Sequence, residues 1–189
     1  MQYFLVNFID EYSRYLVHWE LLTNMEGHSI SIGAQRALET LDRDASGELA
    51  IKPIIRSDNG SGYISAEFGG LLSHHGLTHQ RIKPHCPEEN GLVERFHRTL
   101  REGIEEHDLK GRYDSLEVIG SLARHYNEVR LHSSLGYQTP ATWYRGNPES
   151  VARARGLKMS QARHRRKQIN LGIRQRTLPF SNPESFSCN

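Results

Sequence analysis

The segment from Ser57 to Arg101 constrains the fold of this chain more than any other part of the sequence. The apolar residues of 52–56 are too few for a helix, so we expect a short strand there. Asp58 comes directly after that strand, and the turn signal Asn59-Gly60 follows it. Open α/β sheets hold their reacting groups at the carboxyl ends of strands. The sequence therefore predicts an α/β fold with Asp58 at a functional edge.

A second carboxylate follows at a defined distance, because thirty-five residues lie between Asp58 and Glu94. Around Glu94 the apolar residues recur at helical spacing, at Leu92, Phe96, Leu100 and Ile104. Glu94 thus lies in the first turn of a helix. Another face of this helix carries charged and polar groups at i, i+3, i+4 and i+7, namely Glu94, His97, Arg98 and Arg101.

A carboxylate beside two guanidinium groups suits a site that holds a metal ion and grips the phosphates next to it. Each feature also has an ordinary structural explanation. Asp-Asn-Gly is a common turn signal, and a Glu in the first turn of a helix is favoured by the helix dipole. The two carboxylates together are more specific than either alone.

The charge of the chain is divided unevenly along its 189 residues. Residues 1–150 hold 15 Lys and Arg against 21 Asp and Glu, whereas 151–189 hold 9 against 1. A basic extension on an acidic body is typical of a nucleic-acid-binding arm, since cations that neutralise phosphates release counterions. A solvated charged helix is the alternative. We expect a core over 1–146 and a basic, partly disordered extension over 147–189.

Composition limits the other possibilities. No apolar run approaches the roughly 20 residues that span a membrane, and the amino terminus lacks the basic start of a signal peptide, so we expect a cytoplasmic protein. Cys86 and Cys188 are far apart and are expected to be free thiols. A zinc site made by several histidines near Cys86 is disfavoured because their spacing is irregular: His74, His75, His79 and His85.

Apolar periodicity places the other elements. Strands are expected at 3–9, 15–22, 52–57 and 77–82, and helices at 26–43, 65–75, 91–109 and 115–130. The first two strands should form an antiparallel hairpin. Residues 83–90 should be a surface loop that ends in Asn90 as a helix N-cap, and Thr139-Pro140 should open a short helix that buries Trp143 and Tyr144.

Four motifs carry a family resemblance: S-D-N-G-S-G-Y at 57–63, P-H-C-P-E-E-N-G at 84–91, V-E-R-F-H-R-T-L at 93–100 and Y-N-E-V-R-L-H-S-S-L-G-Y-Q-T-P at 126–140. Together they resemble the integrase core of bacterial insertion-sequence transposases, which is related to retroviral integrases. The resemblance covers roughly residues 3–146. It implies a ribonuclease-H-like mixed sheet flanked by helices, and DNA transposition through an Asp, Asp, Glu triad.

By this resemblance Asp58 and Glu94 are catalytic ligands of Mg²⁺ or Mn²⁺. The DNA, which comprises transposon ends and target, would lie along two basic groups of residues: His97, Arg98 and Arg101, and Arg163, Arg165, Arg166 and Lys167. The full-length form is expected to be a homo-oligomer, and no membrane partner is expected. Neither the target sequence nor the terminal sequence is predicted.

The family's first Asp lies on a strand that precedes the position of Met1, so we expect the first strand to be missing. Asp10 matches the hairpin turn of the family and not that Asp. Residues 1–189 alone are therefore expected to show little strand transfer. Two alternatives remain open at this point: a catalytically inactive DNA-binding remnant, and a ribonuclease-H-like nuclease.

Overall fold

The computed structural model describes residues 2–84 and 86–177 and divides the chain into two compact units, Met1–Gly146 and Asn147–Asn189. Unit 1 combines strands and helices, and the described part of unit 2 is a single long helix. The boundary between the units follows Gly146.

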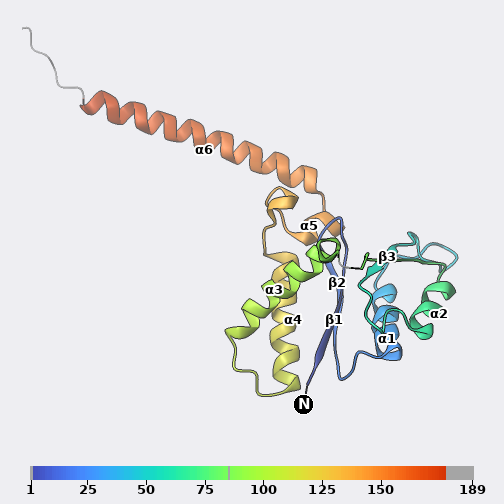
Figure 1. Cartoon of the computed structure of the whole chain (residues 1–189). Coiled ribbons are helices and arrows are strands. Elements are labelled where there is room, and N and C mark those ends of the chain that lie inside the picture. Colours follow the sequence, from blue (N-terminus) through green and yellow to red (C-terminus); the bar gives the residue numbers. More distant parts are fainter. Residues whose placement is uncertain (1, 85, 178–189) are drawn as a thin grey trace, which may run out of the picture. The chain divides into compact units, whose positions relative to one another are not determined.

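A β-hairpin lies at the centre of unit 1. Strand β1 (Phe4–Ile9) pairs antiparallel with β2 (Leu16–Leu22), which confirms the predicted hairpin. Helices α1 (Gly27–Glu39) and α2 (Ala66–His74) lie on one side of it, and α3 (Gly91–Glu105) and α4 (Arg112–Glu128) lie on the other (Figure 1). The hairpin therefore separates two hydrophobic cores.

A bulge in β2 decides which side chains enter each core. Phe8 pairs with His18 but Ile9 pairs with Leu16, so Val17 is the extra residue. The extra residue shifts the alternation of side chains between the two faces of the hairpin. As a result, Leu16 packs in the same core as Leu21. That core contains Leu16, Leu21, Phe96, Leu100, Ile119, Ala123 and Tyr126. The opposite core contains Val6, Ile30, Ala34, Phe68 and Leu72.

A second pair of strands is parallel. Strands β3 (Ile54–Ser57) and β4 (Thr78–Arg81) run in register from Ile54 opposite Thr78 to Ser57 opposite Arg81. Helix α2 connects them, and it begins at the N-cap Ser65, whose side chain accepts a hydrogen bond from the Phe68 amide. Among the described residues the two strand pairs are separate ladders, one antiparallel and one parallel.

Several helix ends differ from the sequence-based expectations; α1 ends at Glu39 and not at 43, and α4 begins at Arg112 and not at 115. A 3-10 turn, Pro87–Asn90, leads directly into α3, so Asn90 already has a turn conformation and its side chain makes no cap hydrogen bond. Asn90 occupies the predicted N-cap position, but its side chain does not cap the helix, because side-chain capping requires an extended residue before the first turn. Helix α3 also ends at Glu105, four residues before the predicted 109.

The short helix after Thr139 agrees with its signal. In α5 (Pro140–Arg145) the Thr139 hydroxyl accepts a hydrogen bond from the Thr142 amide, and Pro occupies the first turn. Trp143 and Tyr144 are half-buried and not fully buried as expected. The reason is that both pack at the hairpin turn, where Tyr144 stacks on Tyr15 with ring centroids 4.3 Å apart and Trp143 meets Tyr12 edge-on.

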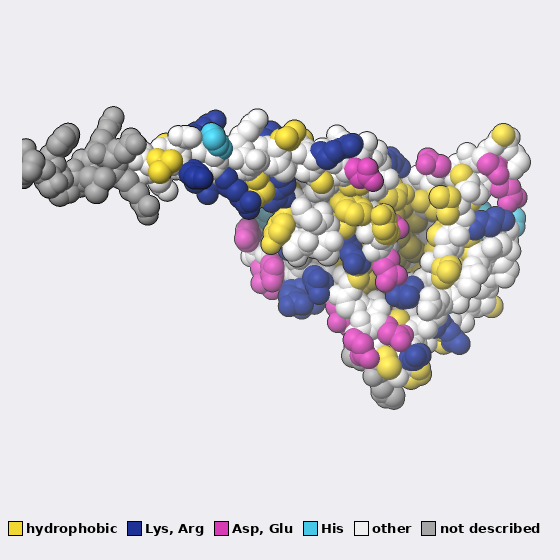
Figure 2. Space-filling view, turned by 90° about the horizontal axis from the view of Figure 1, so that it is seen from above, with side chains coloured by type: hydrophobic (Ala, Val, Ile, Leu, Met, Phe, Trp, Pro, Cys, Tyr) yellow, Lys and Arg dark blue, Asp and Glu magenta, His cyan; other side chains and the backbone are white. Residues whose placement is uncertain are grey.

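Unit 2 contains helix α6 (Pro148–Thr177), whose described side chains are almost all exposed. Figure 2 shows Lys and Arg side chains along the segment that leads to the grey residues. Those with described side chains are Arg153, Arg155, Lys158, Arg163, Arg165, Arg166 and Lys167. The polar end, 178–189, and Cys188 within it lie outside the described residues. Over the described ranges, no helix has the length and apolar character needed to cross a membrane.

Candidate active site

Asp58 stands at the carboxyl end of β3, where its side chain is exposed. Its Oδ1 accepts a hydrogen bond from the Gly60 amide at 2.9 Å, and the Asn59 side chain donates to the carbonyl of Ile82 at 3.0 Å. A Cβ added at Gly60 would come within 2.9 Å of the same Oδ1. The turn therefore fixes the Asp58 carboxylate at the surface, beside the end of the neighbouring strand β4.

The strand end itself is anchored by a buried residue. Ser57 is 8% exposed, and its hydroxyl donates to the Asp58 carbonyl at 2.8 Å and lies 2.9 Å from the His79 Nε2. Burial, and then Arg81, lowers the pKa of His79. Since the His79 ring also packs edge-on against Phe68 in the core, it holds the backbone under Asp58 in place.

Tyr63 is a neighbour of Asp58 that sequence reasoning did not single out. Burial, followed by the negative charge of Asp58, raises the pKa of the Tyr63 phenol to about 12. Its ring packs edge-on against Phe68, with centroids 5.5 Å apart. The sequence does contain a signal for this neighbour. Tyr63 ends the S-D-N-G-S-G-Y segment, and the turn within that segment brings its end back toward Asp58.

Glu94 lies in the first turn of α3 and is exposed. Phe96 and Leu100, on the other side of the helix, are 2% and 5% exposed and pack in the core. Burying that stripe orients the helix, so Glu94 faces outward together with Arg98 and Arg101, as their spacing predicts. Whether these three residues act together at one site stays a prediction.

His97 does not belong to that exposed face. It is half-buried, and its Nε2 forms a hydrogen bond with Asn7 Oδ1 on β1. Burial lowers the pKa of His97, Arg101 lowers it further, and Glu94 opposes the change. The predicted position of His97 on the outer face is therefore wrong, because it lies at the edge of the apolar stripe and ties α3 to the hairpin.

Two family models of the integrase core domain match this chain, one over residues 1–87 and the other over residues 75–140. Together they cover most of unit 1. The chain belongs to the integrase core family. It is 36% identical over 88 residues to a 39.2 kDa protein of insertion element IS476 from Xanthomonas euvesicatoria, covering 46% of this chain and 25% of that protein. It is 28% identical to the transposase for insertion sequence element IS904 from Lactococcus lactis, covering 77% of this chain and 55% of the transposase.

Retroviral integrase catalytic cores share the fold of this integrase core. The HTLV-2 integrase catalytic core domain, solved in complex with magnesium, superposes with a TM-score of 0.57 at 17% identity, covering 74% of this chain and 83% of that one. The ribonuclease-H-like fold class predicted from the sequence is thereby confirmed. The chain spans a quarter to about half of the length of the two curated relatives, from IS476 and IS904.

The carboxylate ligands that the integrase core offers are chemically suited to a divalent cation, but they are few. Asp58 and Glu94 provide the exposed carboxylate oxygens that Mg²⁺ prefers. Within the described residues, no group of three His, Cys, Asp or Glu side chains lies close enough to hold a metal ion. The histidines near Cys86 are used otherwise, since His79 bonds to Ser57 and His74 packs on His75, while His85 is outside the described residues.

Asp10 is occupied by the hairpin turn. Its carboxylate accepts hydrogen bonds from the Ser13 amide, at 2.7 Å, and from the Ser13 hydroxyl, and Ser13 is 1% exposed. The next residue, Arg14, has a left-handed backbone with φ 64°. Asp10 thus stabilises a strained turn, in agreement with its match to the hairpin turn of the integrase core family.

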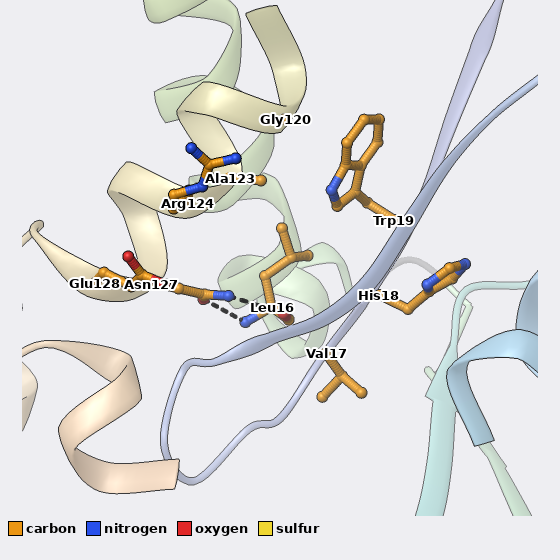
Figure 3. Close-up of a pocket in the computed structure, with 9 residues that line it drawn as sticks. All are labelled: Leu16, Val17, His18, Trp19, Gly120, Ala123, Arg124, Asn127 and Glu128. Atoms are coloured by element: carbon orange, nitrogen blue, oxygen red, sulfur yellow. Dashed lines mark hydrogen bonds between the residues drawn. The ribbon is translucent and has the colours of Figure 1, made fainter. Parts of the chain in front are cut away.

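A groove of about 440 Å³ lies elsewhere, between β2 and α4 (Figure 3). Trp19 on β2 and Gly120 and Arg124 on α4 line it. Neither Asp58 nor Glu94 is among its lining residues. Since both carboxylates are exposed and lie outside this groove, the groove is a separate feature of unit 1.

Proposed function

We propose that unit 1 is the catalytic core of a DNA transposase that cuts and joins phosphodiester bonds with the help of a divalent metal ion. One observation carries the proposal. Asp58 at the end of β3 and Glu94 on the first turn of α3 are both exposed, and each extends from an anchored backbone. The buried Ser57 anchors Asp58, and the buried Phe96 on the opposite side of α3 anchors Glu94. Membership of the integrase core family supports the same function.

Asp58 and Glu94 would hold Mg²⁺ or Mn²⁺. When bound in such sites, these ions activate a water or a DNA 3′-hydroxyl and stabilise the leaving oxygen of an in-line displacement at phosphorus. The chain's own contribution is positional. Gly60 donates to one oxygen of Asp58 and leaves its second oxygen available, while Arg98 and Arg101 place two phosphate-binding groups along the helix from Glu94.

The DNA substrate would be held in part by α6. Its four central cations, Arg163, Arg165, Arg166 and Lys167, are exposed on a helix that has no acidic residue after Glu149. Cations of this kind bind phosphates without reading sequence. We therefore assign part of the DNA affinity to α6 and the reaction to unit 1.

An inactive DNA-binding protein is the second candidate. It is favoured by the observation that the described residues bring no third carboxylate to Asp58 and Glu94. A protein of this kind would keep the basic residues and bind DNA without nicking it. Metal binding alone does not separate the two candidates, so the test needs a second readout.

The first test is calorimetric titration of Mn²⁺ and Mg²⁺ into the whole chain. Asp58→Asn and Glu94→Gln should each weaken binding at least tenfold, because each removes one ligand charge without changing shape. Glu117→Gln on α4 is the matched control, since Glu117 is exposed and lies away from both carboxylates in sequence. Equal metal affinity in all four proteins would refute the shared site.

The second readout is nicking of a supercoiled plasmid with Mn²⁺. Nicking that is abolished in Asp58→Asn and Glu94→Gln and retained in Glu117→Gln supports the transposase core. Metal binding and DNA binding without any nicking would favour the inactive protein. Cleavage of an RNA–DNA hybrid in preference to the plasmid would favour a ribonuclease-H-like nuclease.

A further inference from the structure

A second, smaller pocket in unit 1 has a strongly basic lining. Its volume is about 270 Å³, and it lies where the β1–β2 turn, the start of α3 and the segment after α4 meet. The charged and titratable groups that line it are Arg14, Arg95, Arg130, His132, Tyr126 and Glu88. Three guanidinium groups therefore share one cavity with a single carboxylate.

The three arginines form no ion pair among the residues that the structure describes. In the part of the chain that the structure describes, none of the ion pairs or side-chain hydrogen bonds involves Arg14, Arg95 or Arg130. Burial is the largest influence on two neighbouring rings, since it raises the pKa of Tyr126 and lowers that of His132, and all three arginines act on both rings by lowering each pKa electrostatically. Guanidinium groups that line one cavity repel one another, and an anion between them relieves that repulsion.

The pocket is built from anchored parts. The His132 ring packs edge-on against Tyr126 at 4.9 Å, and Tyr126 packs edge-on against the buried Phe96 at 4.9 Å. The His132 amide donates to the Gln138 carbonyl at 3.0 Å, which fixes its backbone. The His132 Nε2 is itself buried and finds no hydrogen-bond partner within the described ranges. A ligand that offers an oxygen would satisfy it.

The turn that carries Arg14 is equally constrained. Arg14 has φ 64°, its amide donates to the Asp10 carbonyl at 2.8 Å, and the Asp10 carboxylate holds Ser13. A left-handed backbone is unfavourable for a residue with a side chain. Here it is maintained by the turn, and it fixes the position from which Arg14 enters the pocket.

We propose that this pocket binds one phosphate group of a DNA backbone. Arg95 and Arg130 are exposed at its rim, whereas His132 and Arg14 lie deeper, so a phosphate on a large polymer can enter. The hydroxyls of Thr99 and Ser134 also line the cavity and can donate to phosphate oxygens. Guanidinium groups match phosphate geometry better than any other side chain.

The inference rests on the proposed function for its choice of ligand. Arg95 directly follows Glu94 on α3 and is turned about 100° from it around the helix. A phosphate bound by Arg95 therefore lies beside the Glu94 face and not on the far side of the helix. The pocket would hold DNA next to the reacting carboxylates and set the position of the strand.

The test is the salt dependence of DNA binding, measured by fluorescence anisotropy with a labelled duplex and the whole chain in EDTA. Arg95→Gln with Arg130→Gln should reduce the slope of log affinity against log salt by about 0.9, the value for one neutralised phosphate. Arg124→Gln on α4 is the matched control and should leave the slope unchanged. Arg95→Lys with Arg130→Lys keeps the charges and should restore most of the slope.

A second measurement follows the His132 imidazole by NMR as inorganic phosphate or the duplex is added. Burial is the largest cause of the lowered pKa of His132, and either anion should raise that pKa because it offsets the further effect of Arg130, Arg14 and Arg95. An unchanged slope in the Gln double variant, or an equal reduction in Arg124→Gln, would overturn the inference. A response of His132 to inorganic phosphate but not to DNA would also overturn it.

DNA binding is measured in EDTA, so this test does not depend on metal and can be distinguished from the test of the proposed function. Asp58→Asn and Glu94→Gln should bind metal much more weakly yet keep the pocket's contribution to the salt slope. Loss of nicking with a normal slope would therefore count against the catalytic proposal alone. A normal metal response with no change of slope in the Gln double variant would count against the pocket alone.

Discussion

The side-chain amide of Asn127 forms two hydrogen bonds with the backbone of Leu16, 111 residues earlier in the chain (Figure 3). The Leu16 amide donates to Asn127 Oδ1 at 2.8 Å, and Asn127 Nδ2 donates to the Leu16 carbonyl at 3.0 Å. Leu16 is the residue at which the bulge in β2 interrupts the ladder. Leu16 keeps Ile9 as its partner across the ladder, and Asn127 binds the Leu16 backbone beside the bulge, which joins α4 to the hairpin.

Replacing Asn127 with Asp should destabilise unit 1 by about 1–3 kcal/mol, because the carboxylate cannot donate to the buried Leu16 carbonyl. The free energy of unfolding in urea measures the effect. Glu128→Gln, at the exposed neighbouring position, is the control and should change stability by less than about 0.5 kcal/mol. Equal stability of Asn127→Asp and the parent protein would show that the pair of hydrogen bonds does not stabilise the fold.

Replacing Asp10 with Ala should also destabilise the fold, by about 1–2 kcal/mol, because Ser13 is left without its acceptor and the left-handed Arg14 without its support. The adjacent Glu11→Ala provides the contrast. Glu11 pairs with Arg56 at 3.0 Å on the surface, where the Glu11 side chain is 65% exposed, and such pairs contribute little. Thermal unfolding of both variants tests the difference, and a larger destabilisation in Glu11→Ala would contradict it.

Local patterns were sufficient to predict most elements of unit 1. The hairpin, the strand before Asp58 and the apolar stripe of α3 all follow from residues that lie close together in the sequence. The double hydrogen bond of Asn127 and the position of His97 against Asn7 could not be predicted, because each depends on packing between segments far apart in the chain. Helical spacing gives the direction of a side chain only to within the width of a face, and His97 lies at such a boundary.

The candidate site likewise combines features that local sequence predicts with features that depend on the packing of distant segments. The turn at Asp58 and the helical position of Glu94 came from local signals. The phosphate pocket did not, because Arg14, Arg95 and Arg130 come from three separate segments and their lack of acidic partners is visible only in the folded chain. In the sequence each of these arginines has acidic residues nearby.

Titration of Tyr63 should report on Asp58. The folded pKa is about 12, above the ordinary value of 10.0, so the Tyr63 contribution to stability is complete below pH 10 and is lost as the pH rises toward 12. Asp58→Asn should lower the pKa of Tyr63 but leave it above 10.0, because burial is the larger cause. Ultraviolet difference titration against Tyr63→Phe measures it. An unchanged pKa in Asp58→Asn would show that the carboxylate does not face the phenol.

Stability should fall in mild acid partly through His97. Its folded pKa lies below the ordinary value of 6.5, so the unfolded chain takes up the proton first. The contribution of His97 to stability is therefore present above pH 6.5 and is lost as the pH falls through the folded pKa. His97→Gln should flatten the dependence of unfolding free energy on pH between about 7 and 5 relative to the parent, whereas His107→Gln, at an exposed position, should not. Parallel curves for the parent and His97→Gln would contradict a buried neutral His97.

Helix α6 should supply non-specific DNA affinity. A chain that ends at Gly146 should bind duplex DNA more weakly, with a salt slope reduced by about 0.9 for each phosphate that is no longer neutralised. Because truncation also removes length, a full-length variant with Gln at Arg163, Arg165, Arg166 and Lys167 serves as the charge-only comparison, and Gln retains good helix propensity. If the slope falls in both proteins, the cations of α6 bind phosphate. If the truncated chain keeps the full slope, α6 is a solvated helix and DNA is bound by unit 1 alone, where the pocket at Arg95 and Arg130 would have to supply the affinity.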